Sequence, residues 1–284
     1  MKREDLPFLV DLKGRVIVVT GAGGVICSEL AKALGACGAK VAYVDWNLEA
    51  AQAKVAEANK EGYFAEAFKC NVLSKEDLAE CHRQINAKLG RVDILINGAG
   101  GNSPKATTTD EYLGEKVGDD VIDFFGLKQE GVEWVFNLNF LGTFLTTQEF
   151  AKDMLNRKGC SILNISSMNA FTPLTKIPAY SAAKAGITNF TEWLAVYFAK
   201  SGIRVNAIAP GFFSTIQNKE LLFNKDGTPT ARTGKILAAT PMGRFGEVKE
   251  LIGATLFLCN ESGASFITGV TLPIDGGFSS YSGV

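Results

Sequence analysis

Short apolar runs recur along this chain of 284 residues, and segments of helical length separate most of them. The runs are rich in Val and Ile, which favour strands. They read RVIVVT, KVAYVD, YFAEAFK, VDILIN, SILNIS, IRVNAIA and VTLPID. Regular alternation of strands with helices predicts an α/β fold with a doubly wound parallel sheet of about seven strands and helices on both faces.

Two long stretches interrupt this alternation, at residues 103–131 and 212–241. Long polar excursions in a compact domain usually serve as binding loops or lids, so both are expected to border a substrate site. The chain has no linker, low-complexity tract or internal repeat. It is therefore predicted to form one domain over residues 1–284.

Composition excludes several classes of function. The formal net charge is −1, which argues against a basic nucleic-acid face. No apolar span reaches membrane length, and the apolar piece near the N-terminus is too short for a signal peptide, so a cytoplasmic protein without a membrane partner is expected. Six cysteines without a C-x-x-C pair are expected to be reduced core residues, with no metal site. His82, the one histidine, is expected on a helix surface.

The stretch TGAGGVIC, Thr20 to Cys27, follows the first apolar run and precedes a predicted helix. A glycine-rich turn there can present helix N–H groups to a pyrophosphate, as in Rossmann-like folds. Asp45 ends the next run and is placed to accept hydrogen bonds from the adenosine ribose. Its charge would repel a 2′-phosphate, and neither Trp46 nor Asn47 supplies a cation to hold one. The sequence therefore favours NAD over NADP.

Candidate catalytic residues lie in the segment ISSMNAFTPLTKIPAYSAAKAG. Tyr180 and Lys184 are four residues apart and would share one face of a helix, while Ser167 ends the preceding strand. A nearby ammonium lowers a phenol pKa, so Tyr180 could exchange a proton with an alcohol or a carbonyl. Ser167 could hydrogen-bond the same oxygen.

These motifs, taken in order, resemble the short-chain dehydrogenase/reductase family over nearly the whole chain. Its Y-x-x-x-K motif matches Tyr180 to Lys184, its serine matches Ser167, and its helix asparagine matches Asn139. The resemblance implies hydride transfer to or from nicotinamide while Tyr180 moves the proton. It also implies that Lys184 orients the nicotinamide ribose and lowers the pKa of Tyr180, and that Asn139 holds a water.

The same resemblance supplies the remaining cofactor contacts. The motif N-N-A-G appears as NGAG, P-G-x-x-x-T appears as PGFFST, and Asn71 replaces the usual aspartate near the adenine. The expected cofactor-binding residues are Gly21, Gly23, Gly24, Val25, Ile26, Asp45, Asn71, Val72, Asn97, Gly98, Ala99, Tyr180, Lys184, Pro210, Gly211, Phe213 and Thr215.

The glycine loop departs from the family pattern T-G-x-x-x-G-x-G. Only Gly21 matches, because Val25 and Cys27 occupy the other two glycine positions. Gly23 and Gly24 are expected to provide positive φ and a close approach to the phosphates. Cys27 is small enough to pack the helix against the strand.

The departures resemble one branch of the family, the D-mannonate oxidoreductases or fructuronate reductases. This implies NADH-linked reduction of D-fructuronate to D-mannonate. A six-carbon hydroxy acid needs hydrogen-bonding side chains and at least one cation. Residues at the expected mouth of the site that could serve are Asn169 and Lys176, which are preferred because both lie between Ser167 and Tyr180, together with Asn102, Lys105 and Arg244. Lys105 and Arg244 are at least as well explained as solvated loop charges.

Other functions remain open on the sequence. Within the enzyme class, the alternative is a dehydrogenase of another polyol or sugar acid, such as a gluconate 5-dehydrogenase; polar loops disfavour a fatty-acyl substrate. A nucleotide-binding sensor without turnover is a second alternative. A Ser-His-Asp hydrolase is disfavoured because no G-x-S-x-G motif is present. The resemblance also implies a homodimer or homotetramer paired through the long helices.

Overall fold

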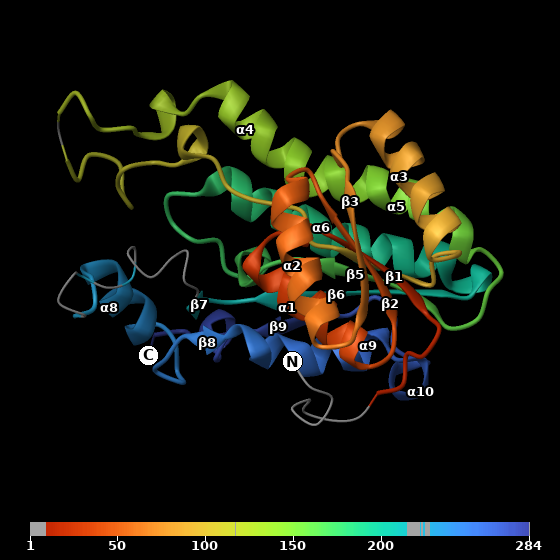
Figure 1. Cartoon of the computed structure of the whole chain (residues 1–284). Coiled ribbons are helices and arrows are strands. Elements are labelled where there is room, and N and C mark those ends of the chain that lie inside the picture. Colours follow the sequence, from red (N-terminus) through yellow and green to blue (C-terminus); the bar gives the residue numbers. More distant parts are fainter. Residues whose placement is uncertain (1–9, 117, 215–221, 223, 225–227, 284) are drawn as a thin grey trace.

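The computed structural model describes residues 10–116, 118–214, 222, 224 and 228–283 (Figure 1). Its main sheet has seven parallel strands in the order β3-β2-β1-β4-β5-β6-β9. These strands are β1 (Val16–Thr20), β2 (Lys40–Asp45), β3 (Phe64–Lys69), β4 (Ile94–Asn97), β5 (Cys160–Ile165), β6 (Ile203–Pro210) and β9 (Thr271–Ile274). Each overlaps one of the seven apolar runs, with β5 beginning one residue before its run and β6 ending one residue after its run, so the predicted α/β architecture is confirmed.

Helices cover both faces of the sheet. They are α1 (Val25–Ala36), α2 (Leu48–Lys60), α3 (Lys75–Lys88), α4 (Gln129–Phe136), α5 (Gly142–Phe150), α6 (Pro178–Phe198), α8 (Ala231–Ala238), α9 (Ile252–Cys259) and α10 (Glu261–Ala264). A π-helical turn, η4 (Asn137–Leu141), joins α4 to α5. Short 3-10 turns are η2 (Pro104–Ala106), η3 (Phe124–Gly126), η5 (Ala151–Met154), η6 (Met168–Ala170), η7 (Ala199–Ser201), η9 (Val248–Leu251) and η10 (Phe278–Ser280).

Alternate residues of β1 enter two separate cores. Ile17 and Val19 pack with residues of α1, α2 and α9 on one face, whereas Val16 and Val18 pack with α3, α5 and α6 on the other (Figure 1). Side chains alternate across a strand, so a strand buried on both faces must be apolar throughout, as β1 is. Burying each such side chain contributes about 1.5–3 kcal/mol relative to leaving it exposed.

The chain changes direction across the sheet between β1 and β4. Strands β2 and β3 lie on one side of this pair, and β5, β6 and β9 lie on the other. In open parallel sheets, ligands bind outside the carboxyl ends of the strands at such a switch point. The loops that follow β1, β2, β4, β5 and β6 therefore define where a functional site is expected.

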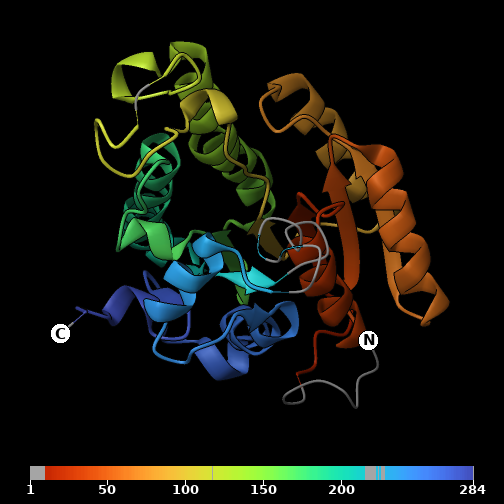
Figure 2. The same cartoon turned by 90° about the vertical axis from the view of Figure 1, so that its left-hand side faces the viewer.

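Both long excursions leave this carboxyl edge. The first, here called the insertion (residues 103–128), contains η2 and η3 and leads into α4; the expected range ran three residues too far, because α4 begins at Gln129. The second carries α8 and β7 (Phe213–Ser214), and β7 pairs with β8 (Gly246–Glu247), which follows this stretch. Figure 2 looks at the side of the molecule on which the insertion and α8 lie.

Candidate functional site

The loop after β1 is held by backbone contacts at the carboxyl edge. Gly21 has φ +69°, and a Cβ there would lie 3.0 Å from the backbone of Ala99 in the loop after β4. The Gly24 N–H donates to the Gly21 carbonyl over 3.0 Å and closes the turn before α1. Positive φ occurs at Gly21 alone in this loop, so the expectation of positive φ at Gly23 and Gly24 is wrong.

Gly23 is needed for close approach instead. A Cβ on Gly23 would lie 2.9 Å from the Ala50 Cβ and 3.0 Å from Asp45 Oδ2. The Gly23 N–H donates to that Oδ2 over 2.9 Å, and the Asn47 N–H donates to Oδ1 over 2.9 Å. Two backbone donors therefore fix the Asp45 carboxylate at the end of β2. No ion pair to Asp45 occurs within the part of the chain that the structure describes.

Helix α1 starts without a side-chain cap. Gly24 is its N-cap residue and offers no side chain to the N–H groups of the first turn, which includes Val25 and Ile26. Unpaired N–H groups at a helix N-terminus, together with the helix dipole, favour a phosphate. This end of α1, beside the Asp45 carboxylate, has the donors and acceptor that a dinucleotide without a 2′-phosphate requires.

Cys27 packs α1 against the loop after β4. A Cβ on Gly98 would collide with Cys27 Sγ, so the small side chain at one position requires a glycine at the other. Cys27 is 6% exposed, and burial raises the pKa of its thiol to about 12, so the thiol is protonated at neutral pH. The predicted packing role of Cys27 is confirmed.

Ser167 and Tyr180 lie close enough for the Ser167 hydroxyl to act on the pKa of Tyr180. Ser167 lies between β5 and η6, and Tyr180 lies in the first turn of α6, which begins with Pro178. Burial raises the pKa of Tyr180, and the Ser167 hydroxyl opposes this only in part. The two hydroxyl groups thus share a small, largely desolvated region at the carboxyl edge.

Lys184 follows Tyr180 by one helical turn and is 5% exposed. Its Nζ donates to the Ile165 carbonyl over 2.8 Å and lies 5.7 Å from the centroid of the Tyr180 ring. Burial lowers the pKa of Lys184 to about 8. The pKa of Tyr180 is raised on balance because burial dominates, whereas Lys184 was expected to lower it.

Asn139 lies in the π-helical turn and is fully buried. Its Nδ2 donates to the carbonyls of Gly101 and Val135 over 2.7 and 2.8 Å, and its Oδ1 accepts from the Gly101 N–H over 3.2 Å. A Cβ on Gly100 would lie 2.6 Å from Asn139 Oδ1 and 3.3 Å from Lys184 Nζ. Asn139 therefore fixes the loop after β4 beside Lys184, and π turns are frequent at functional sites.

The side chains of three residues that were expected to contact the cofactor instead make contacts within the protein. Asn97 donates through Nδ2 to Thr147 Oγ1 and Asn164 Oδ1, both over 2.9 Å, within the interior. Asn71 accepts from the Leu73 N–H over 3.0 Å and shapes the turn before α3. Val72 is 7% exposed and packs close to Gly142, where a Cβ would lie 2.9 Å from it.

The residues after β6 form a close contact with the end of β9. Gly211 donates to the Ile274 carbonyl over 2.9 Å, and a Cβ on Gly211 would lie 2.6 Å from Asp275. Pro210 ends β6, and Phe213 is a buried member of the core beneath α1. Thr215, the expected carboxamide contact, lies outside the described residues.

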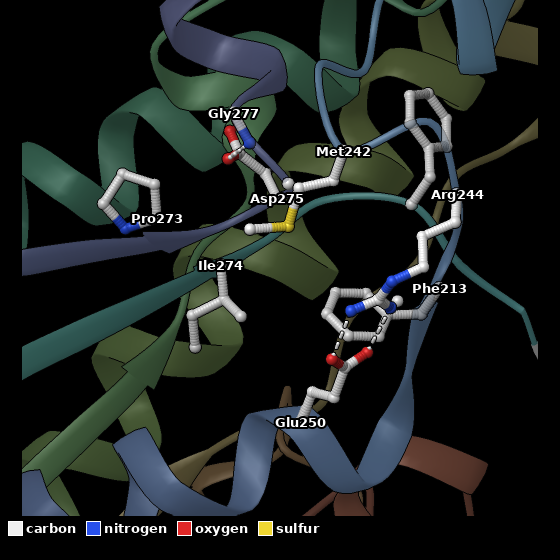
Figure 3. A pocket seen from close by; sticks show the side chains of 11 residues that line it. Phe213, Met242, Arg244, Glu250, Pro273, Ile274, Asp275 and Gly277 are labelled. Carbon is white, nitrogen blue, oxygen red and sulfur yellow. Dashed lines mark hydrogen bonds and ion pairs between the residues drawn. The ribbon is translucent and has the colours of Figure 1, made fainter.

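A pocket of about 410 Å³ lies beside this contact. Arg244 lines it, and Figure 3 shows its guanidinium joined to Glu250 by two hydrogen bonds, both 2.7 Å long. Hydrogen bonds from Arg244 and the Glu247 N–H hold the pKa of Glu250 at about 2. Arg244 was expected to bind substrate, but in the structure its charge is already paired with Glu250.

The other expected substrate residues lie around the insertion. Asn169 is 3% exposed, and its Nδ2 lies 3.5 Å from Ser181 Oγ. Asn102 is exposed and donates to Thr107 Oγ1 over 3.0 Å. Lys105 pairs with Glu130 over 3.7 Å at the surface. Lys176 precedes α6 with φ +73°, and its carbonyl accepts from the Thr108 N–H over 2.8 Å.

Comparison with known proteins decides the family. The family model described as short chain dehydrogenase matches residues 15–225. The chain belongs to the short-chain dehydrogenase family. An uncharacterized oxidoreductase of Haemophilus influenzae is 58% identical over 274 residues, which cover 96% of each chain. The 2-dehydro-3-deoxy-D-gluconate 5-dehydrogenase of Formosa agariphila is 32% identical over 95% of this chain and 94% of its own.

A solved structure agrees with this short-chain dehydrogenase closely. It is a candidate D-mannonate oxidoreductase from Haemophilus influenzae with bound NAD, 57% identical, with a TM-score of 0.94 over 97% of this chain and 98% of that one. The predicted family, its resemblance to the mannonate branch and its activity class as an oxidoreductase are confirmed.

Sequence reasoning missed Thr20 as a site residue of this dehydrogenase. Its Oγ1 accepts from the N–H groups of Gly98 and Ala99 over 3.1 and 3.3 Å, which fixes the loop after β4 to the end of β1. The threonine of the T-G pair was the available signal. In the sequence, Trp46 mattered only because it is not a Lys or Arg that could bind a 2′-phosphate. In the structure its side chain, next to Asp45 in the chain, is 76% exposed.

The prediction for His82 is wrong. The residue is 8% exposed and lies between two carboxylates, with Nδ1 2.9 Å from Glu149 Oε1 and Nε2 2.9 Å from Asp153 Oδ2. This cluster joins α3 to the end of α5, away from the carboxyl edge. The six cysteines are buried and unbridged, as predicted. Within the described ranges, no group of three or more His, Cys, Asp or Glu could hold a metal, and no helix could cross a membrane.

Proposed function

We propose that this short-chain dehydrogenase interconverts a hydroxyl and a keto group on a sugar acid with NAD(H), with D-fructuronate and D-mannonate as the pair. The placement of Ser167 and Tyr180 beside buried Lys184, whose Nζ lies 5.7 Å from the centroid of the Tyr180 ring, carries the catalytic part of the proposal. The NAD-bound Haemophilus influenzae structure and the gluconate dehydrogenase relative support the cofactor and the substrate class.

The cofactor is proposed to lie along the carboxyl edge, where the nicotinamide accepts or donates a hydride. Asp45 would bind the adenosine ribose hydroxyls, and the N-terminus of α1 would bind the pyrophosphate. Lys184, already held by the Ile165 carbonyl, would orient the nicotinamide ribose. Pro210 and Gly211 would border the nicotinamide.

Tyr180 is the proposed proton donor to the substrate carbonyl. Because burial raises its pKa, the phenol is protonated at neutral pH and is ready for reduction. Ser167 would hydrogen-bond the same carbonyl oxygen and stabilise the charge that develops on it. Lys184 keeps a positive charge near the ring, because its lowered pKa of about 8 still exceeds neutral pH.

The decisive experiment compares substrates and cofactors. Purified protein is supplied with NADH and, in parallel, D-fructuronate, D-tagaturonate and 5-keto-D-gluconate, and loss of NADH absorbance is measured. Preference for D-fructuronate is expected, with NADPH much less effective because the Asp45 carboxylate repels a 2′-phosphate. Preference for another keto acid would move the substrate to the second candidate, a dehydrogenase of another sugar acid, which the relative from Formosa agariphila favours.

The proposal includes assembly into homodimers or homotetramers in the cytoplasm. Helix α6 exposes Trp193 and Tyr197, which stack with ring centroids 4.8 Å apart, and α5 exposes Phe144. Exposed aromatic patches of this kind usually mark protein interfaces. Light scattering of the eluting protein should give a mass of two or four chains of 30.4 kDa.

A further inference from the structure

One carboxylate connects three segments that are far apart in the sequence. Glu111 belongs to the insertion, and its Oε1 lies 2.8 Å from Nζ of Lys235 in α8. The hydrogen bond from Lys235, together with the nearby charge of Lys176, holds the pKa of Glu111 below its usual range. In Figure 2 the insertion, the start of α6 and α8 lie along the same side of the molecule.

Lys176 places this cluster near the proposed proton donor. It lies four residues before Tyr180, just ahead of α6, and is half-buried. Its left-handed φ of +73° is rare for a residue with a side chain, and the hydrogen bond from Thr108 to its carbonyl ties it to the insertion. The backbone thus ties Lys176 to the insertion at a point four residues before Tyr180.

The insertion also fixes Glu111 itself. Glu115 accepts from the N–H groups of Glu111 and Tyr112 over 3.0 and 3.3 Å. Asp110, the preceding acid, pairs with Lys116 over 3.1 Å. Glu115 contributes only a charge to Lys235 from further away, whereas Glu111 makes the direct contact. Glu111 is therefore the acid of the insertion that directly pairs with a lysine of α8.

The cluster has two ammonium groups and one direct carboxylate partner. Lys235 is 69% exposed and Glu111 is 26% exposed, and water weakens exposed ion pairs. Another carboxylate could therefore replace Glu111 at little cost. A substrate acid bound at Tyr180 needs such a cationic partner.

We propose that Lys235 and Lys176 bind the carboxylate of the substrate in place of Glu111, which makes Lys235 a specificity-determining residue for sugar acids. This inference rests on the proposed function. Glu111 pairs with Lys235 in the free protein and competes with the incoming acid.

The test uses Lys235→Gln, Glu111→Gln and, as a matched control, Lys249→Gln. Lys249 is 70% exposed and pairs with Glu247, so its exposure and its ion pair with a glutamate match those of Lys235 at a different place in the fold. Steady-state rates with NADH and D-fructuronate should show that Lys235→Gln raises KM about tenfold, the loss typical of one charged hydrogen bond. Its kcat should stay within about twofold, because proton transfer by Tyr180 is untouched. Lys249→Gln should leave both constants unchanged.

Glu111→Gln separates competition from simple positioning. Removing the competing charge should lower KM by about two- to fivefold, as expected for an exposed ion pair. A rise in KM would mean that Glu111 only positions Lys235 and would overturn the displacement. An unchanged KM in Lys235→Gln would overturn the inference while leaving the proposed function intact.

A binding measurement judges the inference without turnover. D-mannonate with NADH cannot react, so calorimetry of the NADH-loaded protein reports binding of the acid alone. Binding that weakens about tenfold in Lys235→Gln, the expected loss of one charged hydrogen bond, supports the inference even if every keto acid proves inactive. Equal binding by wild type and Lys235→Gln, or no binding by either, overturns it. Matching circular dichroism and melting temperatures will verify that the variants fold.

Discussion

The loop after β1 and the insertion after β4 border the same edge of the sheet but are held in different ways. The first is fixed by backbone hydrogen bonds and by glycines that leave no room for a Cβ, as at Gly21 and Gly98. Among the residues that the structure describes, the insertion contacts α8 through the ion pair of Lys235 with Glu111, in which the lysine is exposed. Steric fit makes the cofactor side intolerant of substitution, whereas exposed charges let the substrate side change with little loss of stability.

The largest expected effect tests the chemistry between these two regions. Tyr180→Phe removes the proposed proton donor and should lower kcat by about 10²–10⁴-fold while cofactor affinity stays close to wild type. Tyr197→Phe, on the exposed part of the same helix, is the matched control and should be silent. Stopped-flow reduction of D-fructuronate measures both. A loss below twofold for Tyr180→Phe would show that Tyr180 is not the proton donor.

On the cofactor side, Asp45→Asn removes the charge but retains the shape of the side chain. KM for NADH should rise by about 10–100-fold, the range for hydrogen bonds to a charged group, and the preference for NADH over NADPH should shrink. Titration of protein fluorescence with each cofactor gives the two affinities. Equal losses for both cofactors would contradict the role of Asp45 in selecting against a 2′-phosphate.

Steric fit on the same side is tested by Gly98→Ala. The added Cβ would meet Cys27 Sγ and lie 2.8 Å from the Thr20 carbonyl, so overpacking should cost about 1–3 kcal/mol of unfolding free energy. Adding Cys27→Ala should recover part of this, because only the contact with Thr20 remains. Urea denaturation measures each variant. No recovery in the double variant would show that the Cys27 contact is unimportant.

Gly234→Ala provides the comparison on the substrate side. Gly234 lies in α8, and a Cβ there would have nothing within 4 Å. Alanine should therefore stabilise the protein by up to about 1 kcal/mol through helix propensity. A loss as large as that of Gly98→Ala would contradict the contrast between the two regions.

A smaller effect on activity is expected at the opposite edge. His82→Gln disturbs the cluster with Glu149 and Asp153 and should cost about 1–3 kcal/mol of stability, with KM and kcat unchanged. Burial acts to raise the pKa of each carboxyl group. Hydrogen bonds, including those from His82, act in the opposite direction and outweigh burial, so the pKa values of Glu149 and Asp153 are lowered overall.

The sign of the pH dependence follows from those shifts. A carboxyl group with a lowered folded pKa adds stability above its unfolded pKa and loses it as pH falls through the folded value. The stability difference between wild type and His82→Gln should therefore shrink below about pH 4. Urea melts across pH 3 to 7 would measure this. A difference that stays undiminished below about pH 4 would contradict the proposed pairing.

The fold could be predicted because the strands are apolar on both faces and recur at regular intervals. The motif residues could be predicted because their spacing is fixed by local geometry, as for Tyr180 and Lys184 on one helical face. The burial of His82 could not, since its partners are 67 and 71 residues away. For the same reason the sequence did not reveal that Glu111 meets Lys235, which is 124 residues away. The pair of Arg244 with Glu250 is different, because the two residues are six apart and both lie in one short stretch of the sequence.

The conformation of the glycine loop was predicted only in part. A glycine can be required because its φ is positive or because a Cβ would collide with a neighbour, and the sequence alone does not distinguish these two reasons. Gly21 has the first property, whereas Gly23 has the second because of Ala50 and Asp45. Such a distinction depends on neighbours brought together by β2 and α2, which the local pattern does not contain.

The π-helical turn that carries Asn139 also restricts which changes of chain length the protein can tolerate. Each residue of a helix advances the chain by about 100° around the axis, so one residue added to or removed from Asn137–Leu141 would turn α4 relative to α5 by that angle. Asn139 would then leave Gly101 and Lys184. Surface loops tolerate insertions and deletions, but this segment does not. Related proteins should therefore differ here by substitution and keep the same number of residues.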